Sequence, residues 1–192
     1  NPKAVRIYGE AGSLQNRKLY DLAAAEWLRL LKTFPDDPLA RKAQFSLGIC
    51  LVQQKQYSAA AASFELTVTR YEPLENIGEA YFQLGWCLYR VAVQRQNDDQ
   101  AAMLGKSIKS FTAGITRSPE GPFADDALYF RGEAYYRLGD PDAAMSSYQQ
   151  LIDKHPESNM RSNGLYALGV VYEEIRKHAD AARIYDLFLE EF

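Results

Sequence analysis

A short pattern of small and aromatic residues occurs five times along the chain. Each copy has a glycine or alanine, a second small residue twelve positions later and an aromatic residue four positions after that. Consecutive copies are 37 residues apart, except that the third contains ten additional residues between its two small positions. The first small residues are Ala11, Gly48, Gly85, Gly132 and Gly169, the second are Ala23, Ala60, Ser107, Ala144 and Ala181, and the aromatic residues are Trp27, Phe64, Phe111, Tyr148 and Tyr185. Self-similarity at this period predicts stacked structural units rather than a globule around one enclosed pocket.

Each copy is predicted to form two antiparallel helices. In the fifth copy, Leu165, Leu168 and Tyr172 share one face of a helix, and Ala181 and Tyr185 share one face of the next. The small residues let the paired helices approach closely, while the aromatic residues fill the space beside them. No stretch shows the alternating pattern of a strand. We therefore expect an all-α solenoid of five helix-turn-helix units, with ten helices and no domain boundary across residues 1–192.

Aspartates and prolines mark the expected helix ends. Asp37 before Pro38, and Asp140 before Pro141, have the order of an N-cap followed by the first helical residue. Proline disfavours helical structure in the residue before it, so the second helix of a unit should end before a proline. Prolines stand at this place in the first, third and fourth units, and one residue late in the second: Pro35, Pro119, Pro156 and Pro73.

Composition excludes several classes of protein. Apolar residues make up 47% of the chain, enough for a well-buried core. The net charge of −3, with lysines and arginines scattered among acids, argues against a nucleic-acid-binding surface. No apolar run approaches the length of about 20 residues that a membrane span needs, and no secretory signal precedes Asn1. Because an initiator methionine is also absent, we expect a processed chain or part of a longer one.

The two cysteines are interpreted as core residues. Cys50 and Cys87 occupy equivalent positions of consecutive repeats, where the other repeats have Ser13, Ala134 and Val171. Free cysteine behaves as a small hydrophobic residue when buried. A disulfide would need Cα atoms within about 7 Å, closer than the axes of neighbouring helices normally pack.

The fifth unit resembles the tetratricopeptide repeat in its order Leu165-x2-Leu168-Gly169-x2-Tyr172, followed by Ala181-x3-Tyr185. The resemblance covers essentially the whole chain and departs from the pattern at Glu10, Ala11, Arg131 and Pro73. It implies a right-handed superhelix whose concave inner face binds a protein or peptide partner. The units lie near residues 4–40, 41–77, 78–124, 125–161 and 162–192.

The spacing of 37 residues is longer than the about 34 of the standard repeat. This longer form, with its turn sequences around Pro73, Pro119 and Pro156, resembles bacterial envelope proteins. Similar ones are the lipoprotein of the β-barrel assembly machinery and the periplasmic coordinator of the Tol-Pal system. The resemblance favours the periplasm or cell envelope, with the cytoplasm as the alternative compartment.

No motif predicts catalysis. Neither of the two histidines, His155 and His178, has a cysteine or the other histidine at metal-chelating spacing. Adjacent acids such as Asp125 and Asp126 diverge by about 100° on a helix, so they cannot easily share one proton. The sequence contains no GxSxG, P-loop or GxGxxG motif. We expect a protein that is not an enzyme, with no catalytic or metal-binding residues and no cofactor.

A second stripe on the first helix of each unit predicts a binding groove. It lies beside the stripe that packs on the paired helix, and its i, i+4, i+7 spacing keeps each set on one face. In proteins of the resembling family this face lines the concave surface; packing between neighbouring helices is the alternative role for its aromatic residues. Trp86, Tyr89 and Tyr136 are the expected apolar anchors, which centres the groove on the third and fourth units. The predicted groove residues are Phe45, Phe82, Trp86, Tyr89, Arg90, Tyr129, Glu133, Tyr136, Arg137 and Tyr166.

Charged residues accompany these anchors. Arg90, Arg137 and Glu174 occupy one column of consecutive units. Arg137 is expected either to pair with Glu174 or to steer an acidic or terminal group of a ligand. Arg90 has no equivalent acid, so it is expected to meet a ligand carboxylate or to stack on an aromatic ring.

Two further features stand outside the regular repeat. The insertion near residues 91–103 should lengthen both helices of the third unit, with Asn97, Asp98 and Asp99 as turn and N-cap; loop elaboration and a docking site are both open interpretations. The last helix is apolar on more than one face, through residues such as Leu189 and Phe192. Further repeats, a capping helix or a partner are expected to cover that end.

These observations predict a noncatalytic scaffold that binds an extended or helical protein segment in an aromatic groove. Bacterial envelope assembly is the setting that the resemblance implies. Two alternatives remain open. One is a homotypic assembly module that associates through its C-terminal end, and the other is a regulatory or targeting segment of a larger enzyme.

Overall fold

The computed structural model describes residues 1–70, 77–95 and 99–192. Within these ranges the chain forms ten α-helices and no strand, which confirms the predicted all-helical fold. The helices are α1 (Pro2–Asn16), α2 (Tyr20–Thr33), α3 (Ala40–Gln53), α4 (Tyr57–Arg70), α5 (Ile77–Gln94), α6 (Asp99–Arg117), α7 (Ala124–Arg137), α8 (Pro141–Lys154), α9 (Arg161–Glu174) and α10 (His178–Glu191).

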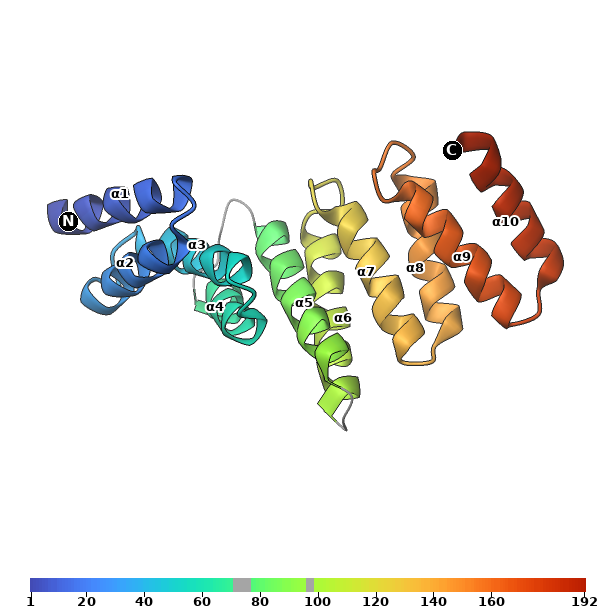
Figure 1. The fold of residues 1–192 in the computed structure, drawn as a ribbon, viewed down its shortest axis with the longest axis horizontal. Helices are drawn as coiled ribbons and strands as arrows, with labels where there is room; N and C mark the ends of the chain where they lie inside the picture. Colours follow the sequence, from blue (N-terminus) through green and yellow to red (C-terminus); the bar gives the residue numbers. More distant parts are fainter. Residues whose placement is uncertain (71–76, 96–98) are drawn as a thin grey trace.

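The helices pair as antiparallel hairpins that follow one another along an elongated solenoid (Figure 1). Each helix packs against the next one in the chain, from α1 through to α10, and α5 also packs against α7. The two ends of the chain lie at opposite ends of the molecule (Figure 1). The core is therefore distributed along the length of the solenoid, in clusters that join each helix pair to the next.

The repeated glycines mark the places where an aromatic ring of the second helix lies directly on the backbone of the first. A Cβ atom added at Gly48 would come within 2.6 Å of the Phe64 ring, and one at Gly85 within 2.7 Å of the Phe111 ring. The same relation holds, with even less space, for Gly132 with Tyr148 and for Gly169 with Tyr185. A side chain at these positions would meet space that is already filled, which explains why the sequence repeats the two residue types together.

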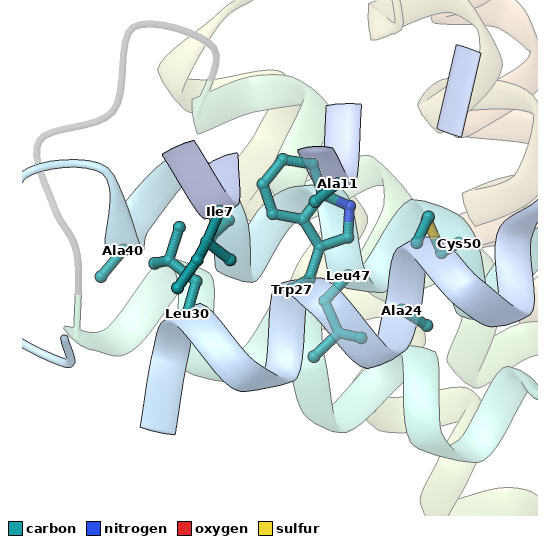
Figure 2. Packing of buried hydrophobic residues seen from close by; sticks show 10 residues of the cluster. Ile7, Ala11, Ala24, Trp27, Leu30, Ala40, Leu47 and Cys50 are labelled. Atoms are coloured by element: carbon teal, nitrogen blue, oxygen red, sulfur yellow. The ribbon is translucent and has the colours of Figure 1, made fainter. Parts of the chain in front are cut away.

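The first unit has alanine and tryptophan in these two positions. Figure 2 shows the Trp27 ring beside Ala11, within a cluster that includes Ile7, Leu30 and Leu47. The indole is buried, and its Nε1 donates a hydrogen bond to Gln15 Oε1 at 2.9 Å. Because this bond satisfies the polar end of the ring, the larger aromatic residue can be buried without an unpaired donor.

Proline and aspartate predict the helix ends well in the fourth unit. Asp140 caps α8, because its Oδ1 accepts a hydrogen bond from the Ala143 amide at 3.1 Å, and Pro141 is the first helical residue. Helices α2, α6 and α8 each end two residues before the prolines at positions 35, 119 and 156, as predicted. Pro73 lies outside the described residues.

The interpretation of Asp37 as a helix N-cap is wrong. Helix α3 begins at Ala40, two residues later than predicted. The Asp37 carboxylate instead accepts a hydrogen bond from the Leu39 amide at 3.0 Å, and the Asp37 carbonyl accepts one from the Ala40 amide at 2.8 Å. Asp37 therefore closes a turn that precedes the helix.

The insertion lengthens both helices of the third pair, as predicted. Helix α5 has 18 residues and α6 has 19, whereas every other helix has 14 or 15. Gln100 Nε2 donates a hydrogen bond to the Ala92 carbonyl at 3.1 Å, which ties the two extended ends together. Helix α6 begins at Asp99, while Asn97 and Asp98 lie outside the described residues.

The cysteines are buried free thiols, which confirms their interpretation as core residues. Burial raises the pKa of Cys50 to about 11 and that of Cys87 to about 12. Of the helices in the described parts of the chain, none has both the length and the apolar character needed to cross a lipid bilayer.

Candidate binding site

A hollow of about 430 Å³ lies between the last two helix pairs. We call it the tyrosine hollow, because four tyrosine side chains contribute to its wall. Four of its residues (Tyr129, Glu133, Tyr136 and Tyr166) belong to the groove predicted from the sequence. The complete lining is Tyr129, Glu133, Tyr136, Tyr148, Ser162, Asn163, Tyr166, Ala167, Val170, Val171 and Phe188, from helices α7 to α10.

One difference between the fourth and fifth units accounts for this opening. Phe130 of α7 fills the space toward α5, with its ring 5.7 Å from that of Tyr89 and 6.4 Å from that of Phe82. The equivalent residue of α9, 37 positions later, is Ala167, which lines the hollow. Helix α7 accordingly packs more closely on α5 than on α9. The small side chain leaves open between α7 and α9 the space that a phenylalanine closes between α5 and α7.

Glu133 places a half-buried carboxylate in the wall of the hollow. Its Oε1 accepts a hydrogen bond from the Tyr148 hydroxyl at 2.8 Å, and its Oε2 accepts one from the Tyr89 hydroxyl at 3.5 Å. Arg137 Nε donates to that same Tyr89 hydroxyl at 2.9 Å. Across the described ranges, no lysine or arginine forms an ion pair with Glu133. Two tyrosine hydroxyls therefore hold the Glu133 carboxylate, with no directly paired cation among the described residues.

Two more tyrosine hydroxyls donate to acids at the end of α9. The Tyr136 hydroxyl donates to Glu174 Oε1 at 2.5 Å, and the Tyr185 hydroxyl donates to Glu173 Oε2 at 3.2 Å. The bond to Glu174 raises the pKa of Tyr136, with smaller contributions from burial and from the charge of Glu133. These phenols therefore remain protonated donors at neutral pH.

The two tyrosines deeper in the wall have raised pKa values as well. For both Tyr129 and Tyr148, burial is the largest cause and the negative charge of Glu133 the next. Burial disfavours the phenolate, and a nearby carboxylate disfavours it further. The hollow thus presents neutral rings beside a fixed negative charge.

The structure places several predicted groove residues elsewhere. Phe82 and Tyr89 are only 8% and 7% exposed, and they pack in the core between α5 and α7. Phe45 lies edge-on to Phe64, with ring centroids 5.5 Å apart, so it packs between the two helices of its own unit. For these three aromatic residues, packing between helices is the role that the structure supports.

Trp86 and Arg90 form a separate cluster with a residue of the preceding unit. The Arg90 guanidinium lies 4.5 Å from the ring centroid of Tyr57 and 5.0 Å from that of Trp86. Of the two roles expected for Arg90, a ligand contact and stacking on an aromatic ring, the structure shows the stacking. The prediction that Arg137 pairs with Glu174 is wrong, because Glu174 accepts the Tyr136 hydroxyl and Arg137 bonds to Tyr89.

Seven of the eleven lining residues are absent from the groove predicted from the sequence, and three of these seven close the hollow. Tyr148 belongs to the aromatic column that packs on glycine, yet one part of it also reaches the hollow. Phe188 of α10 and Ala167 of α9 close the other side. The replacement of Phe130 by Ala167 in aligned repeats is the one signal in the sequence that could have located the opening.

Comparison with known proteins agrees with this architecture. The tetratricopeptide repeat family matches residues 8–75 and 126–158, which together make up just over half of the chain. The chain belongs to the tetratricopeptide repeat family. Outer membrane protein assembly factor BamD of Rickettsia prowazekii (strain Madrid E) is 22% identical in an alignment of 191 residues. The alignment covers 92% of this chain and 75% of that protein.

Solved structures of other tetratricopeptide repeat proteins share the fold. MamA superposes with a TM-score of 0.80 at 19% identity, over 97% of this chain and 90% of that chain. YrrB, described as a tetratricopeptide repeat protein with an unusual peptide-binding site, superposes with a TM-score of 0.75 at 19% identity, over 97% of this chain and 85% of that chain. At these identities the likeness shows the helical solenoid alone.

Proposed function

We propose that this protein is a noncatalytic scaffold that binds a segment of a partner protein in the tyrosine hollow. The observation that carries the proposal is an open, largely apolar hollow whose rim residues Tyr136 and Tyr166 are 37% and 59% exposed. Exposed aromatic side chains around a concavity are typical of interaction sites, because they bury a large area and lose few rotamers on binding. Repeat solenoids commonly use such surfaces to bind extended or helical segments.

The third unit plays a different part in this proposal from the one expected from its sequence. Tyr89 does not line the hollow, but its hydroxyl donates to Glu133 and accepts a hydrogen bond from Arg137. Trp86 and Arg90 lie outside the lining, where Trp86 is edge-on to Tyr57 and the Arg90 guanidinium lies over both rings. We therefore centre the proposed contact surface on the fourth and fifth units. The peptide-binding site of YrrB, a structural relative, supports this class of function without locating the surface.

Selection from a phage-displayed random peptide library on the immobilised protein would test the proposal. Selected peptides are then measured by fluorescence anisotropy against wild type, Ala167→Phe and Ser46→Phe. Ala167→Phe fills the hollow with the side chain found at Phe130, whereas Ser46→Phe makes the same kind of change at the equivalent position of α3, far along the chain. We expect Ala167→Phe to weaken binding at least about tenfold, a loss of about 1.4 kcal/mol, and Ser46→Phe to leave it unchanged.

Two results would count against the proposal. One is that the library yields no peptide that binds the folded protein. The other is that selected peptides bind Ala167→Phe as tightly as wild type although circular dichroism shows that this variant is folded.

A role in bacterial envelope assembly is the setting that we propose for this scaffold. It is supported by the likeness to BamD, whose name describes an outer membrane protein assembly factor, over 92% of this chain. Fractionation of cells that express the full-length gene product would test it. Recovery of the protein solely from the cytoplasm would contradict the proposed setting and leave the binding function in place.

Homotypic assembly is a second candidate, favoured by the exposure of Leu189 and Phe192 on α10 and directly after it. Large apolar side chains in contact with water favour association when several lie together. Light scattering over a range of concentrations separates the two functions. A constant monomeric mass would exclude assembly through this end of the described chain.

A further inference from the structure

The lining of the tyrosine hollow contains one charged side chain, and it is acidic. Glu133 lies in its wall, and Glu173 and Glu174 accept hydroxyl hydrogen bonds from Tyr185 and from the rim residue Tyr136. Arg137 is the cation on the α7 side, where its Nε is already engaged by the Tyr89 hydroxyl. The tyrosines of the hollow therefore bond to two carboxylates, Glu133 and Glu174, while Arg137 is bonded to Tyr89 and Glu173 to Tyr185, both outside the lining.

The aromatic walls complement a positive charge in a second way. Four tyrosine rings line the hollow, and two of them, Tyr129 and Tyr148, have centroids 6.0 Å apart. Tyr166 lies on the opposite helix, 6.4 Å from the ring of Phe188. The faces of aromatic rings carry negative electrostatic potential, so a cation that lies against them is attracted without any need for a matching hydrogen-bond acceptor.

Beyond the polar residues Ser162 and Asn163 at the start of α9, the remaining wall suits an aliphatic chain. Ala167, Val170 and Val171 line the α9 side, and none of them carries a polar side chain. Lysine and arginine have several methylene groups before their charged ends, and these bury well along apolar surface. An acidic side chain in the same place would approach Glu133, and like charges that meet in a partly desolvated site are unfavourable.

We infer that the partner segment inserts a lysine or arginine side chain into the tyrosine hollow, with its charged end between the tyrosine rings and opposite Glu133. This inference rests on the proposed function, since it names the chemistry of the segment that the hollow binds. Charge complementarity selects this occupant over a purely apolar or an acidic segment. The sign is the reverse of the one expected from Arg90 and Arg137, because the structure directs both of those arginines at aromatic residues of the protein itself.

Small probes test the inference directly. The full chain, labelled with nitrogen-15, is titrated with the N-acetyl methylamides of lysine, arginine, norleucine and glutamate, and the backbone amide shifts of Ala167 and Val170 are followed. Norleucine has an aliphatic side chain like that of lysine and lacks the ammonium group. We expect the lysine or arginine probe to bind at least about fivefold more tightly than norleucine, and the glutamate probe to bind least.

Glu133→Gln is the decisive variant. Glutamine keeps an oxygen that can accept the Tyr148 hydroxyl hydrogen bond and removes the charge, so the fold should be retained. We expect the preference for the cationic probe over norleucine to fall below about twofold, while the affinity for norleucine stays the same. Glu65→Gln, on the exposed face of α4, is the matched control and should keep the full preference.

Three results would overturn the inference: norleucine binding as tightly as both cationic probes, no saturable shift with either cationic probe, or a full preference retained in Glu133→Gln. The peptide selection separates this failure from that of the proposed function. Selected peptides that lack basic residues, and that bind wild type but not Ala167→Phe, would refute the inference and leave the proposed function standing. If the library yields no binding peptide, both are contradicted.

Discussion

Gly132→Ala is the substitution that tests most directly why the repeat pairs a glycine with an aromatic residue. A Cβ atom at this position would overlap the Tyr148 ring, well inside the 3.4–4 Å of an ordinary van der Waals contact. The ring has little freedom to move, because Tyr148 is buried and its hydroxyl is held by Glu133 at 2.8 Å. We therefore expect the added methyl group to strain the contact between α7 and α8.

The magnitude follows from two opposing effects. Overpacking of a buried contact costs about 1–3 kcal/mol. Replacing glycine by alanine inside a helix stabilises it by about 1 kcal/mol. Gly105→Ala in α6 is the matched control, because a Cβ there would have no neighbour within 4 Å and only the helix effect applies. The two variants should thus differ in stability by about 1–3 kcal/mol, or by roughly 2–12 °C in Tm for a chain of this length.

Thermal unfolding followed by circular dichroism measures this difference, and amide hydrogen exchange locates it. Because a solenoid repeat contacts only its neighbours, Gly132→Ala should speed exchange in α7 and α8 and leave α1 and α2 unchanged. If Gly132→Ala and Gly105→Ala raise Tm by the same amount, the reasoning is refuted, since Tyr148 would then move aside at no cost. Ala11 beside Trp27 shows that alanine fits this column where the helices are spaced for it.

Two further predictions concern ionisable groups. Arg161 donates to both carboxylate oxygens of Glu191, at 2.6 and 2.7 Å, and these bonds lower the pKa of Glu191. A lowered pKa in the folded state contributes stability above the ordinary glutamate pKa and loses it as the pH falls through the lowered value. The Tm difference between wild type and Glu191→Gln should therefore close on acidification, and a difference that persists unchanged at about pH 2 would contradict this assignment. Cys50 and Cys87 are buried with raised pKa values. Ellman's reagent at about pH 8 should therefore modify them only in denaturant. Rapid reaction of the native protein would contradict this and show that the helix pairs separate readily.

The fold was predictable because its determining contact joins residues that the sequence repeats together. Gly85 and Phe111 remain partners even though ten additional residues separate them, since the insertion lengthens both helices and leaves their contact in place. The boundary of α3 was less predictable. Asp37 and Pro38 have the order of a helix start, yet the same two residues also suit a turn, and the turn is what forms.

The position of the hollow was harder to predict than its residue types. Tyr89 and Tyr136 share one column of consecutive units, so the sequence treats them alike. Phe130 packs on Tyr89, while the equivalent Ala167 leaves Tyr136 at the edge of an opening. Exposure of a helix face thus depends on one residue of the following unit, and no pattern within a single helix contains that information.

Tyr148 has a consequence for how recognition by this protein can change. The Tyr148 ring packs between α7 and α8 and, although it is only 1% exposed, also belongs to the lining of the tyrosine hollow. A substitution of Tyr148 that changes ligand specificity would therefore also weaken the packing of α7 against α8. Sequence differences among relatives should therefore concentrate on exposed positions such as Tyr166. A ligand that fits the hollow tightly should also stabilise the fourth unit against unfolding.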